Sequence, residues 1–189
     1  MYHTTEVIGN NQPSSAKTRI LAVSRQVFAQ KGYEAVGIQE ICDLATVTKP
    51  TLYYHFGNKA GLLSAVCTDA RHAFLQALGD QLHYSGDLVS DIRGLFKDVA
   101  RFSQEDADRF QLLLQMLFPP TGSTVGAQTH DDAAAITASV ERFFREASRG
   151  HGNISGKETE IAEVFLGHAI ALTRITATQR DGDGAKHVI

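Results

Sequence analysis

Apolar residues recur at intervals of three and four along most of the chain and rarely alternate with polar ones. That spacing places them on one face of an α-helix, whereas a half-buried strand needs strict alternation. No proline falls within residues 51–118 or 121–189, and the interior of a helix tolerates proline poorly. The pattern therefore predicts an all-α fold.

Two helices are expected near the N-terminal end. The first extends from Ser14 or Ser15, either of which suits an N-cap, to about Lys31, and Gly32 is expected to end it. The second is short and has a single apolar face, formed by Ile38, Ile41, Cys42 and Ala45.

A further short helix is expected to begin after Thr48, with Pro50 in its first turn. Leu52 and Phe56 stand four residues apart and are expected to anchor this helix inward. Two short helices joined by a three-residue turn match a helix-turn-helix, whose second helix enters the major groove of DNA.

The side of this third helix that faces away from Leu52 carries groups that suit DNA. The outward and flanking positions hold Pro50, Thr51, Tyr53, Tyr54 and His55. Hydroxyl groups bond phosphates or base edges, and Lys49 and Lys59 add cations near helix N-termini. Taken alone, residues 51–56 are more typical of a core helix with both tyrosines inside. The matched helix, the turn and the capped helix around them favour the DNA interpretation.

Five longer helices are expected after this region. Their expected starts are Asn58, Asp87, Ser103, Thr129 and Ser155. The first of them is expected to end near His83, and Ser103 with Asp106 resembles a capping box. Residues 119–127 are the most loop-like interior segment.

Residues 17–66 resemble the N-terminal DNA-binding domain of the TetR family of transcriptional regulators. The matching phrases are RILAVSRQVFAQKGY at 19–33 and IQEICDLATVTKPTLYYHFGNKAGLL at 38–63. This resemblance implies a ligand-responsive regulator, with repression the commoner behaviour. Such a regulator binds a two-fold symmetric operator in double-stranded DNA as a homodimer, and a small-molecule effector of unknown identity releases it.

The expected organisation follows from the helices and the resemblance together. It has a disordered tail at 1–14, a helix-turn-helix domain at 15–57, a helical effector-binding and dimerisation domain at 58–180 and a flexible tail at 181–189.

The resemblance also implies which residues contact DNA. They are Gln39, Thr48, Lys49, Pro50, Thr51, Tyr53, Tyr54, His55 and Lys59. Three positions depart from the family pattern. Thr46 stands in the turn where the family usually has Gly, and Gly37 stands where a Ser or Thr usually caps the second helix. Gly61 stands where a capping-box Glu is common at the start of the fourth helix. A β-branched residue is costly at positive φ, and each glycine is expected to weaken a helix start by at most ~1 kcal/mol.

Two sets of residues in the longer helices take roles from the resemblance. An effector pocket is expected to be lined by Phe74, Phe96, Phe102, Phe110, Met116 and Phe118. A four-helix dimer interface is expected to include Phe144, Phe165, His168, Leu172 and Ile175. Ordinary packing within the chain is the alternative for both sets, because an apolar stripe at helical spacing is more often core. Effector binding is expected to tilt the helix that begins at Lys59.

The charge distribution hints at a polyanionic partner for the N-terminal end. Residues 1–60 carry six basic and four acidic side chains, whereas residues 61–189 carry 12 and 17. The apolar runs are too short for a transmembrane helix, and residues 1–15 lack the pattern of a secretory signal. A cytoplasmic protein without membrane partners is therefore expected.

No cofactor, metal site or enzymatic activity is expected. No two histidines stand four residues apart, and the chain lacks a nucleophile elbow, a P-loop and a dinucleotide fingerprint. Cys42 is expected to be buried, and Cys67 to be buried or, less readily, a thiol sensor. The rival function is a helical ligand- or partner-binding protein that does not read DNA sequence.

Overall fold

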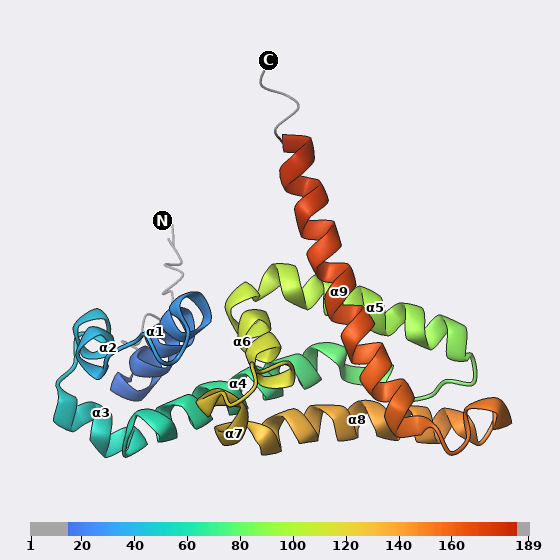
Figure 1. Cartoon of the computed structure of the whole chain (residues 1–189), viewed down its shortest axis with the longest axis horizontal. Coiled ribbons are helices and arrows are strands. Elements are labelled where there is room, and N and C mark those ends of the chain that lie inside the picture. Colours follow the sequence, from blue (N-terminus) through green and yellow to red (C-terminus); the bar gives the residue numbers. More distant parts are fainter. Residues whose placement is uncertain (1–14, 185–189) are drawn as a thin grey trace, which may run out of the picture.

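The computed structural model describes the backbone of residues 15–184 and the side chains of residues 15–79, 82–171 and 173. Every regular element in this part of the chain is helical, which confirms the all-α prediction (Figure 1). The α-helices are α1 (Ala16–Lys31), α2 (Ile38–Ala45), α3 (Lys49–Phe56), α4 (Lys59–Leu78), α5 (Leu88–Glu105), α6 (Ala107–Leu117), α7 (Thr124–Gln128), α8 (His130–Ser148) and α9 (Glu158–Gly184). The expected tail at 1–14 lies outside the described residues.

Helices α1–α3 form a small unit, here called the head, at one end of the elongated molecule (Figure 1). Its centre is made by Ile20, Phe28, Ile41 and Leu52, whose side chains are fully buried. The guanidinium of Arg19 on α1 donates a hydrogen bond of 3.2 Å to the Ala45 carbonyl at the end of α2. Apolar packing and this bond together fix α2 and α3 against α1.

Helices α4–α9 form the rest of the molecule, here called the body. α4 runs from the head into the middle of the body, where α5, α6 and α8 pack on it (Figure 1). The body core is aromatic: Phe74 meets Phe102 edge to face with ring centres 5.5 Å apart, and Phe144 meets Phe165 at 6.0 Å. α6 also packs on α1, so it contacts both regions.

Side-chain caps confirm four of the predicted helix starts. Each of the cap residues accepts a hydrogen bond from the backbone N–H three residues later: Ser15, Thr48, Asn58 and Asp87. The predicted capping box at Ser103 is wrong. α5 continues past this residue, whose hydroxyl donates to the Ala100 carbonyl, and Asp106 caps α6 instead.

Three further boundaries differ from expectation. α4 ends at Leu78, and the following residues form a short 3₁₀ turn, η1 (Gly79–Leu82), rather than more α-helix. The expected loop at 119–127 contains α7, which Ser123 caps and whose own residue Val125 is buried. α9 extends to Gly184, four residues into the segment expected to be a tail.

None of the described helices combines the length and the apolar composition that a membrane span requires.

Candidate nucleic-acid interface

Helix α3 is short but firmly placed. The Thr48 hydroxyl accepts a hydrogen bond from the Thr51 N–H at its start, and Pro50 occupies the first turn, where its missing N–H costs nothing. Leu52 is fully buried, and Phe56 packs half-buried against the same core. These contacts determine which side of α3 faces the protein and therefore which side faces solvent.

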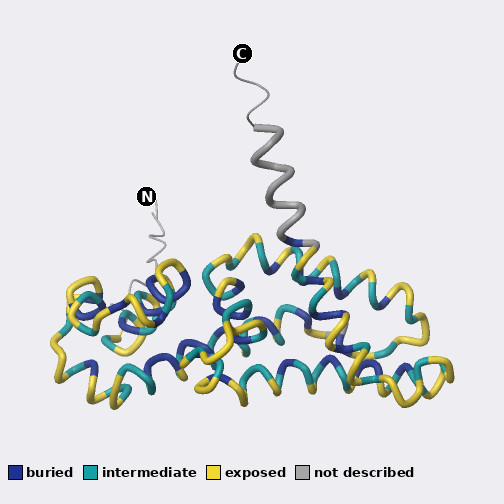
Figure 2. The backbone as a smooth tube through the Cα atoms, viewed as in Figure 1, coloured by how far each residue is buried: buried dark blue, intermediate teal, exposed yellow. Residues whose placement is uncertain are grey.

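The solvent side of α3 carries most of the residues expected to contact DNA. Tyr54 is 85% exposed and Tyr53 is 44% exposed, which is unusual for tyrosine. The burial colours of Figure 2 show exposed positions along α3 at the outer end of the head. Lys49 and Pro50 are exposed beside them, and Thr51 is half-buried. The exposed surface of α3 thus combines a cation, aromatic rings and hydroxyl groups.

Several of these side chains are held by neighbours. The Thr48 and Thr51 hydroxyl oxygens lie 2.9 Å apart, and the half-buried His55 ring meets Tyr54 edge to face at 5.1 Å. Gln39 is exposed on α2, where its amide donates a 2.7 Å hydrogen bond to Asp43. A surface that is partly ordered before binding loses less entropy when a partner docks.

Lys59 lies in the first turn of α4, and its ammonium group sits 4.2 Å from the centre of the Tyr33 ring. Tyr33 follows α1, is almost fully buried and hydrogen-bonds the Gln128 side chain of α7. Burial raises the pKa of the Tyr33 hydroxyl, so this group stays neutral. Tyr33 therefore supports Lys59, a role that the helical pattern did not indicate, although this tyrosine closes the matching phrase at 19–33.

The turn between α2 and α3 contains a left-handed residue. Thr46 has φ 53° and ψ 55°, and among the described residues no other non-glycine has a positive φ. Its N–H donates to the Asp43 carbonyl and the Val47 N–H to the Cys42 carbonyl, which is a Schellman ending. Glycine is the usual residue here, so the expectation of strain at Thr46 is supported by its geometry.

The turn between α3 and α4 is tight. The Asn58 N–H donates to the Phe56 carbonyl across Gly57, which has φ 73°. A Cβ atom on Gly61 would lie 2.2 Å from the Phe56 carbonyl oxygen. Glycine at 61 is thus required by a close backbone approach, and the expectation that it merely weakens α4 has to be corrected.

Residues 20–66, which include this surface, match the family model described as bacterial regulatory proteins, tetR family. The transcriptional activator FasR of Mycolicibacterium smegmatis is 29% identical over 145 residues, which are 76% of this chain and 64% of FasR. Residues 20–66 therefore form a TetR-family DNA-binding domain. The TetR family is one of helix-turn-helix transcription regulators and not of enzymes.

Solved TetR-family structures have the same fold. PfmR from Thermus thermophilus superposes with a TM-score of 0.65 at 21% identity, over 85% of this chain and 86% of PfmR. AibR, solved in complex with isovaleryl coenzyme A and operator DNA, gives a TM-score of 0.66 at 21% identity, over 85% and 86% of the two chains. The match to FasR spans less than two thirds of that relative's length.

The residues expected to line an effector pocket lie in three different environments. The side chains buried in the packed core are Phe74, Phe102, Phe110 and Met116. Phe118 is exposed at the end of α6. Only Phe96, of the six, lines the groove of about 480 Å³ between α5 and α9.

The residues expected at the dimer interface also differ in their burial. Phe144 and Phe165 are buried within this chain, the alternative that their sequence pattern had left open. His168 is exposed on α9, with a ring nitrogen 3.1 Å from the Val164 carbonyl. The side chains of Leu172 and Ile175 lie outside the described residues.

Both cysteines are buried thiols. Cys42 lies in the head core as expected, and burial raises its pKa. Burial raises the pKa of Cys67 to about 12, with a smaller contribution from the charge of Asp132. A thiol with so high a pKa reacts slowly, which argues against the sensor alternative for Cys67. In the described part of the chain no cluster of His, Cys, Asp or Glu could hold a metal ion.

Proposed function

We propose that this protein is a ligand-responsive transcription regulator that binds a two-fold symmetric DNA operator as a homodimer. The observation that carries the proposal is the exposed side of α3. Tyr54 is 85% exposed on a helix whose opposite side is anchored by the fully buried Leu52. A short helix with one anchored side and one exposed polar and aromatic side suits insertion into the major groove.

Each proposed contact has its own task. Lys49, Pro50, Thr51 and Tyr54 reach base edges, because they occupy the outer side of α3. Thr48, Tyr53, His55, Lys59 and the more distant Gln39 bind the backbone, which fixes register without reading sequence. Each good base contact discriminates by only ~1–3 kcal/mol, so one helix is not selective enough. Two copies that are one helical turn of DNA apart supply the remaining selectivity.

The response to a ligand passes through α4 in this proposal. Asp69 on α4 accepts hydrogen bonds from Arg25 on α1 at 3.3 Å and from Arg109 on α6 at 2.8 Å. The Gln115 amide on α6 donates to the Phe28 carbonyl of α1 at 3.3 Å. Because α4 is one continuous helix with Lys59 in its first turn, a ligand that displaces α6 or the far end of α4 moves Lys59. The size of the response is limited by the difference in ligand affinity between the two conformations.

Repression is the proposed outcome, since a bound dimer blocks any promoter sequence that its operator overlaps. The name of FasR describes an activator, so the sign of regulation needs its own test. Transcription from a template that carries the selected operator should fall as protein is added. A rise would assign activation and leave the DNA-binding proposal intact.

Selection of bound sites from a random DNA pool tests the main proposal. We expect an enriched inverted repeat, with half-sites about one helical turn apart, and an affinity that falls steeply as salt rises. No enrichment, together with binding that is independent of salt, would favour the rival helical binding protein.

Three variants test the assigned contacts. Tyr53→Ala and Lys59→Ala should weaken binding to every sequence, and the loss of Lys59 should lower the salt slope by about one. Thr51→Val should change the preferred bases instead, because its hydroxyl is assigned to the groove. An unchanged preference in Thr51→Val would show that α3 is oriented differently on DNA.

A further inference from the structure

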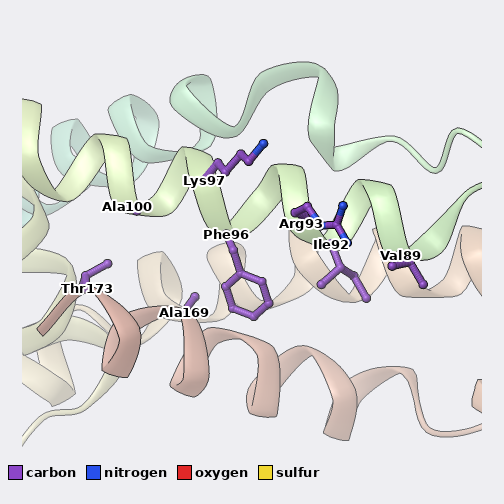
Figure 3. A pocket seen from close by; sticks show the side chains of 8 residues that line it. All are labelled: Val89, Ile92, Arg93, Phe96, Lys97, Ala100, Ala169 and Thr173. Atoms are coloured by element: carbon purple, nitrogen blue, oxygen red, sulfur yellow. The ribbon is translucent and has the colours of Figure 1, made fainter. Parts of the chain in front are cut away.

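A groove of about 480 Å³ lies between α5 and α9 (Figure 3). Ile92 and Phe96 of α5 point toward α9, where Ala169 and Thr173 face them (Figure 3). Phe96 also packs on Phe165, with ring centres 4.9 Å apart, which holds its ring in place. The floor of the groove is therefore apolar and fixed, and its volume is typical of small-molecule sites.

Two cations stand along the α5 side of this groove. Arg93 and Lys97 line it, are four residues apart and are exposed. Neither forms a salt bridge with any of the described residues. Arg101, one turn further on and off the groove, is instead paired with Asp98 at 2.8 Å and with Glu105 at 4.0 Å. The unpaired charge of α5 is thus concentrated beside the apolar floor.

We propose that this groove binds an anionic amphiphile, a small molecule with an apolar chain and a carboxylate or phosphate group. The chain lies along Ile92 and Phe96, and the anion meets Arg93 and Lys97. Charge complementarity selects this occupant, because a neutral apolar ligand would leave both cations unused and a cationic one would be repelled. The proposal rests on the proposed function, since such a ligand would be the effector.

The position of the groove suits an effector. α5 packs on α4 through Phe102 and Phe74, and α4 carries Lys59 at its other end. A ligand wedged between α5 and α9 shifts α5 relative to α4, and α4 transmits the shift to the head. The site is distinct from the aromatic core between α4, α5 and α6, where Phe74, Phe102 and Phe110 were expected to line the pocket.

Calorimetric titration of the full chain with octanoate and decanoate tests the proposal without DNA. Octanol and octylammonium, of similar chain length, serve as probes of the head group. We expect the carboxylates to bind once per chain, and decanoate about 15-fold more tightly than octanoate, since each buried methylene contributes about fourfold. Equal binding of octylammonium, or no carboxylate binding at all, would overturn the proposal.

Matched variants locate the site. Arg93→Gln with Lys97→Gln should weaken decanoate binding by about tenfold, because one exposed ion pair contributes up to about fivefold. Arg101→Gln, which changes a cation on the same helix outside the groove, should leave the affinity unchanged. Ala100→Leu, which fills the groove without touching either cation, should also weaken binding. An equal loss in Arg101→Gln would place the anion elsewhere and refute the assignment.

A second copy of the chain is the competing occupant of the groove. If it covers the groove, the Arg93→Gln and Lys97→Gln variant will change the monomer–dimer equilibrium in sedimentation, decanoate will not bind, and the proposal fails.

Operator binding by the same preparations is measured separately. Decanoate binding without operator binding would refute the proposed function alone, and operator binding that no carboxylate alters would refute the effector assignment alone.

Discussion

One aromatic pair in the head and one in the body differ sharply in exposure. Tyr53 and Tyr54 are neighbours on α3 and both are exposed, whereas Phe143 and Phe144 are neighbours on α8 and both are buried. Exposed aromatic surface does not contribute to folding and favours contact with other molecules, so it persists where binding requires it. The difference shows that exposure, more than residue type, separates a functional surface from a core. It also leads to separate predictions for stability and for DNA binding.

The largest expected effect on stability comes from replacing one aromatic residue with alanine in each region. Phe143→Ala should cost about 3–5 kcal/mol of unfolding free energy, because it leaves a cavity in the body core. Tyr54→Ala should cost less than about 0.5 kcal/mol, because its side chain is mostly in solvent. Urea denaturation followed by circular dichroism measures both.

DNA binding should show the reverse order for these two variants. Under conditions where both remain folded, Tyr54→Ala should bind the selected operator much more weakly and Phe143→Ala nearly as well as the parent chain. Fluorescence anisotropy of a labelled operator measures this. A Tyr54→Ala protein that loses stability but keeps its operator affinity would mean that α3 is a structural helix.

The next effect concerns the junction between head and body. Gly61→Ala should destabilise the protein by about 1–3 kcal/mol, because its new Cβ would overlap the Phe56 carbonyl oxygen. This loss runs against the gain of up to ~1 kcal/mol that alanine normally gives in a helix. Gly152→Ala in η2 (Gly152–Ile154), where a Cβ meets nothing within 4 Å, is the matched control. Its unfolding free energy should change by no more than about 0.5 kcal/mol. A stable Gly61→Ala chain would show that the turn relaxes.

These two regions differ in how far the sequence could predict them. The head was predicted almost to the residue, because its helices are short and their ends depend on local groups such as Ser15 and Thr48. In the body the five longer helices were predicted but not all their ends, and α7 was missed. α5 passes Ser103 because Phe102 is held against Phe74, a contact between residues far apart in sequence.

The two candidate sites, the α3 surface and the groove, also differ in how far the sequence could predict them. The exposed side of α3 follows from the helical positions around Leu52, so periodicity alone gives it. The groove does not follow from periodicity, because Ile92 and Phe96 belong to the same apolar stripe as the buried Leu95 and Val99. Only the position of α9 decides which part of that stripe is covered. The location of the groove is therefore determined by tertiary packing and not by the spacing of apolar residues along one helix.

A smaller effect is expected in the turn of the head. Thr46→Gly should stabilise the protein by about 0.5–1 kcal/mol, since relief of ~1–2 kcal/mol of left-handed strain exceeds the entropic cost of glycine. Thr46→Ala keeps a Cβ and should give no such gain, which makes it the control. Urea denaturation of both variants measures the difference. Equal stability of the glycine and alanine variants would show that the Thr46 backbone carries no strain.

The smallest effect lies at the other end of α2. Gly37 precedes this helix in an extended conformation, makes no side-chain cap and would place a Cβ in open space. Gly37→Ser should therefore raise the free energy of unfolding by a few tenths of a kcal/mol, because the serine hydroxyl accepts a hydrogen bond from an N–H of the first turn. Gly37→Ala lacks this acceptor and should be less stable than Gly37→Ser by about 0.5–2 kcal/mol. Neither residue change touches α3, so operator affinity should stay constant while stability rises or falls. If operator affinity instead changes together with unfolding free energy across these variants, then the packing of α2 controls the position of α3. The exposed surface of the head would then depend on its core more closely than the burial pattern indicates.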